Sequence, residues 1–387
     1  MTRVCGVVAE YDPFHNGHAW HLREARRVTG ADFIVCVMSM HFTQRGMPAL
    51  LAPHVRAEMA LCSGADAVLG LPVSFSVCEA ERFARGGLSI LRALGADCLS
   101  FGAEPESLPL IKPAAQLLDA PDAAFQSRLR ALLGEGLSFP KAQGQALAEA
   151  LGVDAALLAQ PNAALGIAYA RANKALGTEL ELFPLPRSGS YHDETLPVDA
   201  LPSATAVRAA ALAGDWERVR AAMPKEAFSL LEQAFAQGDF HPPQALDALL
   251  RWRLRAGDDF SALPALSEGL ENRLPRAADC LSREEMIRAV KTKRYPYARI
   301  SRLLTHVLLG TDAKLLSPLP TRAYVLGFRR EASGLLKSSD SLALLPSLPT
   351  RAADAECALD ARAADLWALG AGQPFGSLYR CKPVIVE

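Results

Sequence analysis

The sequence predicts an α/β fold: a doubly wound parallel sheet in an N-terminal domain, followed by a mainly helical C-terminal domain. Short continuous apolar runs, typical of strands buried on both faces, alternate with stretches of helical spacing over residues 4–101. After about residue 212, helical patterns dominate. A chain of 387 residues is long enough for two such domains, which we place at residues 1–212 and 213–387.

The expected elements follow one another in a regular order. Strands are predicted at residues 4–9, 33–38, 67–71, 98–101 and 179–183. Helices are predicted at residues 18–28, 56–63 and 80–94, and over most of residues 108–176, with breaks at Pro121, Pro140 and Pro161. Segment 184–202 is rich in Pro, Gly, Ser and His, and we expect an ordered loop there.

The composition restricts the class of protein. The formal net charge is −1, so bulk charge does not favour a nucleic acid or a membrane, and such a partner would need a local basic patch. The first apolar run is short and ends at Glu10 and Asp12, unlike a signal peptide, and no stretch approaches the roughly 20 apolar residues of a membrane span. The eight cysteines form no CxxC, and we expect buried, reduced thiols in a cytoplasmic protein.

The first strand is followed by the segment EYDPFHNGH at residues 10–18. In a doubly wound sheet, ligands bind at the carboxyl ends of the strands. Gly17 allows a ligand to approach the backbone, and the next helix offers N–H groups and its positive dipole end to an anion. His15 and His18 lie one turn apart, so both imidazoles can donate to phosphate oxygens. This arrangement suits a nucleoside triphosphate that is attacked at its α-phosphorus.

Two other interpretations of these histidines remain open. The first is a capped helix with surface histidines. The second is a metal site made of His15, His18 and His21. Because there is no HExxH motif and a further ligand would have to come from Glu10 or Asp12, we expect no metal ion here.

A second motif, residues 203–208 with the sequence SATAVR, supports the phosphate interpretation. Ser203 or Thr205 can cap a helix, and Arg208 would then extend toward the same anion. The alternative is an ordinary cap with a solvated arginine. Together the two motifs resemble the nucleotidyltransferase superfamily of HxGH enzymes, in which the second motif contacts the β- and γ-phosphates. Class I aminoacyl-tRNA synthetases share that arrangement.

The segment at residues 10–18 also resembles the EYNPFHNGH signature of the bacterial tRNA(Met) cytidine acetate ligase family. Further matching strings extend over nearly the whole chain. They are Ser39 with His41-Phe42 and Gln44-Arg45-Gly46, Gly64-Ala65-Asp66 with Leu71-Pro72, Phe101-Gly102-Ala103-Glu104, Pro161-Asn162, Tyr191-His192-Asp193, Ser203-Ala204-Thr205, Glu268-Gly269-Leu270-Glu271-Asn272-Arg273 and Lys291-Thr292-Lys293-Arg294-Tyr295.

The resemblance implies a Rossmann-like domain and a specific two-step reaction. Family members activate acetate with ATP to acetyl-adenylate, releasing pyrophosphate, and then acetylate N4 of the wobble cytidine of elongator tRNA(Met). The expected catalytic residues are His15, His18, Ser203, Thr205 and Arg208. The expected ATP-binding residues, with Mg²⁺ accompanying the nucleotide, are Val8, Ala9, Glu10, Tyr11, Asp12, Pro13, Phe14, His15, Asn16, Gly17, His18, His21, Gly102, Asn162 and Arg187.

Three residues depart from the family pattern. Asp12 replaces the usual Asn, Ala103 replaces a usual Ser, and Met40 replaces a usual Gly. The negative charge of Asp12 beside phosphates would weaken nucleotide binding unless Asp12 helps to hold Mg²⁺.

Three of the expected ATP-binding residues have weaker support from the residues alone. Gly102 ends a strand and would leave room for adenine or ribose. Asn162 could bind the nucleotide or cap the helix after Pro161. Arg187 could neutralise phosphates or be solvated.

Basic residues with two tyrosines among them gather between residues 288 and 302. They are Arg288, Lys291, Lys293, Arg294, Arg299 and Arg302, with Tyr295 and Tyr297. Basic side chains neutralise phosphates and aromatic rings stack on unpaired bases, whereas a charge run is usually a solvated face. With the resemblance, we expect Lys291, Lys293, Arg294, Tyr295 and Arg299 to bind tRNA.

Two rival functions remain at this stage. One is a small-molecule adenylyltransferase, which would not need the basic C-terminal segment. The other is an RNA-binding protein with a decayed ATP pocket, which does not explain why both phosphate motifs are complete. The residues by themselves identify neither acetate nor the tRNA, and the oligomeric state stays open.

Overall fold

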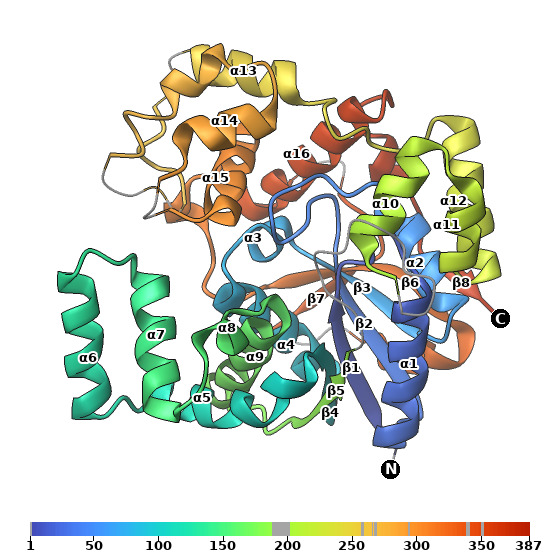
Figure 1. The fold of residues 1–387 in the computed structure, drawn as a ribbon. Helices are drawn as coiled ribbons and strands as arrows, with labels where there is room; N and C mark the ends of the chain where they lie inside the picture. The colour runs from blue at the N-terminus through green and yellow to red at the C-terminus, as the bar shows by residue number, and fades with distance from the viewer. Residues whose placement is uncertain are drawn as a thin grey trace.

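The computed structural model describes residues 2–187, 202–256, 259–264, 266, 269–292, 295–337, 341–349 and 352–387. One sheet runs through the centre of the molecule, with helices on both faces and a further group of helices beyond one end of its strands (Figure 1). This arrangement confirms the predicted doubly wound α/β fold.

The strands of the sheet come from both ends of the chain. They are β1 (Val4–Ala9), β2 (Phe33–Ser39), β3 (Ala67–Leu71), β4 (Cys98–Ala103), β5 (Glu181–Pro186), β6 (Arg322–Arg329), β7 (Ala343–Leu345) and β8 (Val384–Val386). Their order is β5-β4-β1-β2-β3-β6-β7, and β8 also pairs with β6. Strands β1 to β5 are parallel, whereas β6 runs antiparallel to β3.

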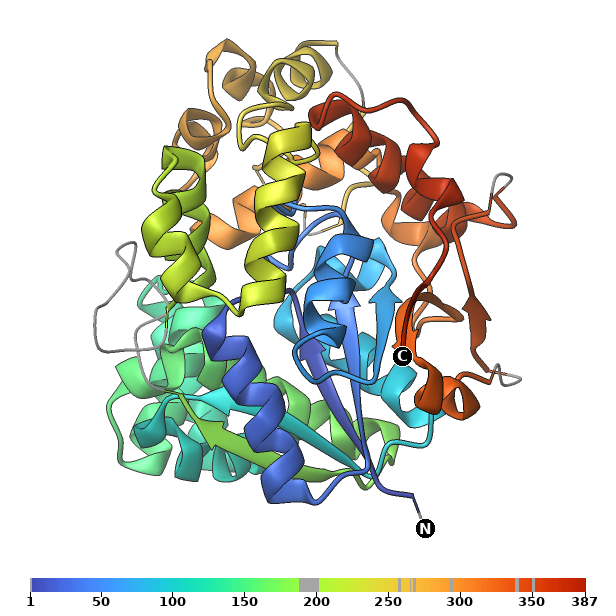
Figure 2. The same ribbon diagram turned by 90° about the vertical axis from the view of Figure 1, so that its right-hand side faces the viewer.

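Two apolar cores cover the two faces of the sheet, and alternate residues of β1 enter them. Cys5 and Val7 pack with the helices of one face, while Val4 packs with those of the other. The first face carries α1 (Asn16–Thr29), α2 (Pro53–Leu61), α10 (Ala204–Ala213), α11 (Trp216–Ala222) and α12 (Lys225–Gln237). The second carries α4 (Ala80–Ala93), α5 (Ile111–Asp119), α6 (Ala123–Gly134), α7 (Phe139–Leu151), α8 (Ala155–Ala159) and α9 (Pro161–Leu176). Figure 2 shows α1 and the helices near residue 230 on one side of the strands.

The remaining helices lie mostly beyond the carboxyl ends of the parallel strands. They are α3 (Val73–Ser76), α13 (Asp247–Arg255), α14 (Arg283–Val290), α15 (Tyr297–Leu309) and α16 (Ala355–Gly370). Short 3₁₀ turns occur at Pro105–Leu110, Pro275–Asp279, Ala313–Leu315, Arg330–Leu335 and Ser377–Arg380. A third core joins α13, α14 and α15 to Phe42 and Val77 of the N-terminal half.

The C-terminal region is less purely helical than the sequence indicates. Strands β6, β7 and β8 join the same sheet as the N-terminal strands. A division at residue 213 therefore does not separate the sheet from the helices. The apolar run at residues 323–328 could have predicted strand β6, but it stands alone between helical stretches and was not interpreted as a strand.

The cysteines also differ in part from expectation. All eight are free thiols, but only Cys5, Cys36, Cys78, Cys98 and Cys357 are buried. Cys62 is exposed, and Cys280 and Cys381 are partly exposed. Within the described ranges, the structure has no helix that is both long and apolar enough to span a bilayer.

A buried arginine ties together the carboxyl ends of β1 and β2. Arg56 of α2 is fully buried, and its guanidinium donates to the carbonyl oxygens of Glu10 (2.6 Å), Ser39 (2.9 Å), Met40 and Leu51 (3.0 Å). Five donors in a rigid fork suit a point where several loops converge. Arg56 therefore fixes the turn that carries the first motif.

We expect Arg56→Ala to lower the free energy of unfolding by more than about 3 kcal/mol, because each buried carbonyl left without a donor costs roughly 1–3 kcal/mol. Urea denaturation monitored by circular dichroism measures this change. Arg23→Ala, an exposed arginine of α1, is the matched control and should stay within about 0.5 kcal/mol of wild type. An equal effect of both substitutions would show that Arg56 does not hold the turn.

Candidate active site

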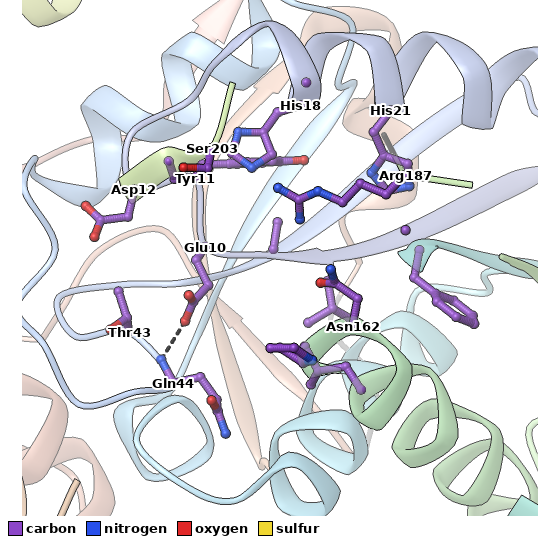
Figure 3. Close-up of a pocket in the computed structure, with 18 of the residues that line it drawn as sticks. Glu10, Tyr11, Asp12, His18, His21, Thr43, Gln44, Asn162, Arg187 and Ser203 are labelled. Atoms are coloured by element: carbon purple, nitrogen blue, oxygen red, sulfur yellow. Dashed lines mark hydrogen bonds between the residues drawn. The ribbon is translucent and has the colours of Figure 1, made fainter. Parts of the chain in front are cut away.

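A cavity of about 430 Å³ opens at the carboxyl ends of β1, β4 and β5. Its volume lies within the roughly 300–1,000 Å³ that is usual for small-ligand sites. Both motifs predicted from the sequence reach it, together with Gly102, Asn162 and Arg187 (Figure 3). The other expected ATP-binding residues that line this cavity are Val8, Ala9, Glu10, Tyr11, Asp12, His15, Gly17, His18 and His21.

His15 is the N-cap of α1, and its Nδ1 accepts a hydrogen bond from the Gly17 N–H at 3.1 Å. The His15 N–H in turn donates to His18 Nδ1 at 3.3 Å, completing a capping box. A Cβ on residue 17 would lie 2.9 Å from the His15 ring, so only glycine admits this arrangement. Because Nδ1 of each neutral ring is an acceptor, the ring proton must lie on Nε2.

The two imidazoles are held as a pair. Their rings stack with centroids 3.7 Å apart, and the Tyr11 ring meets His18 edge-on at 4.9 Å. His15 is 1% exposed, and within the described part of the chain its Nε2 has no hydrogen-bond partner. A buried, unpartnered N–H donor beside a helix N-terminus is suited to an anionic ligand.

Burial keeps all three histidines of the first motif neutral. It lowers the pKa of His15 to about 3 and of His21 to about 4, and the Arg187 guanidinium contributes in both cases. The pKa of His18 is also lowered, first by burial and then by His15, Arg187 and His21. His21 shares a hydrogen bond of 3.1 Å with the Ser100 hydroxyl. Positive charge in this part of the site therefore comes from arginine.

Three residues expected to bind ATP do not line the cavity. The Phe14 side chain is completely buried in the core, 4.9 Å from the Tyr11 ring. Asn16 points away and donates to the Ala221 carbonyl at 2.9 Å. Pro13 lies within the turn and is absent from the cavity wall. The structure thus gives Phe14 and Asn16 a packing and anchoring role, and it gives Pro13 no contact with the cavity.

Asp12 lines the cavity and forms an ion pair with Arg208. One carboxylate oxygen of Asp12 accepts from the Leu50 N–H at 2.6 Å, and the other accepts from Arg208 Nη1 at 2.9 Å. Arg208 Nη1 also donates to the Asp12 carbonyl at 2.8 Å. Asp12 therefore positions Arg208 and offsets part of its charge.

The same contacts bear on the expected magnesium ion. Each Asp12 oxygen accepts one N–H bond, and the Arg208 guanidinium beside the carboxylate disfavours a second cation there. Among the described residues, no group of three His, Cys, Asp or Glu side chains is placed to hold a metal ion.

The second motif lines the cavity beside the first, since Arg208 contacts Asp12 directly. Ser203 is the N-cap of α10, and its hydroxyl accepts from the Ala206 N–H at 3.1 Å. The expected cap is thus confirmed at Ser203. Thr205 and Arg208 follow in the first turns of α10 and line the cavity. The N-termini of α1 and α10 therefore meet at one site.

The far side of the cavity holds the remaining expected residues. Asn162 does not cap α9, whose N-cap is Gln160; instead its amide donates to Glu104 Oε1 at 2.8 Å. A Cβ on Gly102 would come no closer than 3.9 Å to Arg187, so the space beside it is open to a ligand. Arg187 follows β5, its N–H donates to the Ala103 carbonyl at 2.9 Å, and its side chain extends toward His18 (Figure 3).

Sequence reasoning missed two parts of the wall. One is the loop after β2, with Thr43, Gln44, Arg45 and Met47, where the Gln44 N–H donates to Glu10 Oε1 at 2.5 Å (Figure 3). The matched string Gln44-Arg45-Gly46 was its available signal. The other is an apolar surface. It consists of Phe83, Phe101, Leu165 and Tyr169.

The basic cluster is only partly described. Lys293 and Arg294 lie outside the described residues. Lys291 is exposed, whereas Tyr295 is 7% exposed and lies beneath Arg299, whose guanidinium is 5.1 Å from the ring centroid. Tyr295 therefore cannot offer its ring as an open stacking surface. Tyr297, which is 41% exposed, is the accessible tyrosine of the cluster.

The fold and site define the class of protein. A family model described as HIGH nucleotidyl transferase matches residues 2–375, nearly the whole chain. The two helix N-termini, the paired histidines and the open cavity are the features that such a phosphate-binding fold requires.

Relatives and solved structures narrow this class. A tRNA(Met) cytidine acetate ligase of Syntrophotalea carbinolica is 38% identical over 82% of this chain and 76% of its own length. One of Clostridium perfringens is 31% identical over 99% of each chain. A crystal structure of Thermotoga maritima TmcAL bound with alpha-thio ATP aligns over 100% of both chains with a TM-score of 0.87 and 28% identity. The apo form of TmcAL gives a TM-score of 0.88 at 27% identity. The chain belongs to the tRNA(Met) cytidine acetate ligase family.

We expect nitrogen NMR of His15 and His18 at pH 7 to show neutral rings with the proton on Nε2. His15 should remain neutral down to about pH 5, and His18 should stay neutral below its usual titration range, because burial lowers the pKa of both rings. The urea-unfolded chain, in which histidines titrate near 6.5, is the control. Titration of either ring near pH 6.5 in the folded protein would contradict this assignment.

We expect Asp12→Asn to tighten ATP binding by roughly three- to tenfold at low salt, because loss of the carboxylate leaves the charge of Arg208 unopposed. The Mg²⁺ dependence of binding should not change. Isothermal titration at several Mg²⁺ concentrations measures both quantities, and Asp32→Asn, at an exposed carboxylate, is the control. A higher Mg²⁺ requirement in Asp12→Asn would instead make Asp12 a metal ligand.

Proposed function

We propose that this protein is an ATP-dependent ligase that forms acetyl-adenylate from acetate and ATP and then acetylates N4 of the wobble cytidine of elongator tRNA(Met). The main support is the cavity in which two neutral histidines, two helix N-termini and the arginines Arg187 and Arg208 converge. Family membership supports the choice of acetate and tRNA over other substrates. We place the activity in the cytoplasm, where the free thiols stay reduced.

In the first step, an acetate oxygen attacks the α-phosphorus, and the bond to the bridging oxygen breaks so that pyrophosphate leaves. The Nε2–H groups of His15 and His18 donate to oxygens whose negative charge grows in this displacement. Arg187, Arg208 and the first turn of α10 bind the β- and γ-phosphates. Ser203 keeps that turn in place as its N-cap, and Thr205 lies at the same wall. The apolar surface takes the adenine. Mg²⁺ would accompany the phosphates and neutralise part of their charge.

In the second step, the cytidine amine attacks the carbonyl carbon of acetyl-adenylate. A C–N bond forms, the C–O bond to phosphate breaks, AMP leaves with the electron pair, and the amine proton is lost to water. Residues 213–387 contribute the RNA contacts, through Lys291, Lys293, Arg294 and Arg299. Tyr295 supports Arg299 from beneath.

We expect His18→Ala to slow acetate-dependent ATP–pyrophosphate exchange by at least about 100-fold, because a donor aimed at transition-state charge is worth roughly 2.7–4 kcal/mol. His54→Ala, at a residue outside the cavity wall, is the matched control. Melting curves verify that both variants fold.

The same assay tests the proposed function as a whole. Exchange stimulated by acetate, followed by N4-acetylcytidine formation in tRNA(Met), is the expected result. Exchange that ignores acetate and responds to a small nucleotide would make the protein a small-molecule adenylyltransferase. Near-normal exchange in a folded His18→Ala variant would remove His18 from the mechanism.

A further inference from the structure

A second cavity, of about 360 Å³, lies next to the ATP cavity. Ala298, in the first turn of α15, lines both cavities. Cys78 and Glu79 line the second cavity, and Ala80 directly after them lines the first. The Gln44 amide, which also faces the ATP cavity, donates to the Cys78 carbonyl at 2.7 Å. The two cavities are thus neighbours that share Ala298.

Both halves of the chain build the second cavity. Arg82 comes from α4, whereas Arg299, Arg302 and His306 come from α15. The segment just before α4 meets α15, because Val77 packs in the same core as Leu303 and Leu304. Figure 1 shows α15 above α3 and the start of α4. A ligand in this cavity would therefore touch the nucleotide-binding half and the helical half together.

The cavity wall is strongly basic. Arg82, Arg299 and Arg302 line it, and Glu79 is the one carboxylate among the residues that do so in the described part of the chain. Burial lowers the pKa of Arg302, and Arg299 and Arg45 act in the same direction while Glu79 opposes them. His306, whose pKa burial lowers to about 3, adds no charge. Glu356 lies behind the wall, where its carboxylate accepts from the Ser74 hydroxyl at 3.0 Å. Guanidinium groups that line one cavity favour an anion inside it.

The start of α15 adds a second feature that suits an anion. Pro296 is its N-cap and makes no side-chain capping bond, and the first turn carries no acidic residue. Pro296 and Ala298 both lie in the wall. The positive end of this 13-residue helix therefore faces the same space as the arginines.

We propose that the second cavity binds the acceptor nucleotide of the RNA, with a phosphodiester at Arg299, Arg302 and the start of α15 and the base directed past Ala298 toward the ATP cavity. This inference rests on the proposed function and adds its acceptor site. A nucleotide held here places its exocyclic amine next to the acyl-adenylate, as the transfer step requires. Arg82, which donates to the carbonyls of Ser74 (2.9 Å) and Ser317 (2.8 Å), is a positioning residue of the wall.

The direct test uses cytidine and cytidine 5′-monophosphate as probes, with the ATP cavity filled by a saturating non-hydrolysable ATP analogue. Wild type should bind the monophosphate at least about tenfold more tightly than cytidine, because the phosphate gains charge-assisted contacts. Arg302→Gln and Arg299→Gln should each reduce that preference to below about threefold. Arg85→Gln, at an exposed arginine one turn along α4 from Arg82, should keep it.

The outcomes separate this inference from the proposed function. The rate of transfer to tRNA(Met), divided by the exchange rate of the same variant, should fall at least about tenfold in Arg302→Gln and Arg299→Gln. An equal affinity of wild type for both probes, or an unchanged preference in both folded variants, would overturn the acceptor site while leaving the exchange reaction intact. Displacement of cytidine 5′-monophosphate by ATP, measured without the analogue, would also overturn the acceptor site, because the monophosphate would then occupy the ATP cavity. Absence of acetate-dependent exchange in wild type would instead refute the proposed function.

Discussion

The active-site geometry depends on one buried guanidinium. Arg56 donates to carbonyl oxygens at the end of β1, at the end of β2 and in the loop that follows. Burial lowers its pKa to about 10, so it remains charged at neutral pH. These segments carry Glu10, Asp12 and Gln44. A single cation that satisfies four carbonyls gives the turn a fixed shape on which both phosphate motifs can converge.

In this site, the neutral hydrogen-bond donors and the positive charges belong to different residues. His15 and His18 are buried, neutral donors, whereas Arg187 and Arg208 supply charge. A neutral donor in a dry environment can stabilise growing phosphate charge without the desolvation cost of a buried cation. Asp12, which also lines the cavity, offsets part of the charge of Arg208 through a direct ion pair.

The two halves of the chain are linked at the functional surfaces. Strand β6 extends the sheet from β3, α3 and α15 contribute to the same core, and Ala298 of α15 lines both cavities. Residues from both halves of the chain therefore line the two neighbouring cavities. Because strands from both halves share one sheet, a boundary near residue 213 marks where the sequence pattern becomes mainly helical but does not mark a break in the packing.

The sequence by itself determined the local features. Buried parallel strands are continuous apolar runs, so β1 and β3 were predicted to the residue, and the two motifs were identified because caps, glycine and histidine act over one helical turn. Tertiary structure decided what depends on distant partners. Asp12 forms an ion pair with Arg208, and Asn162 donates to Glu104. Phe14 is buried in the core, and β6 pairs with β3. Each of these contacts joins residues that are far apart in the chain or that come from several elements. Local patterns cannot encode such pairings, because the same residue type is a ligand, an anchor or a solvated side chain according to what the fold brings beside it.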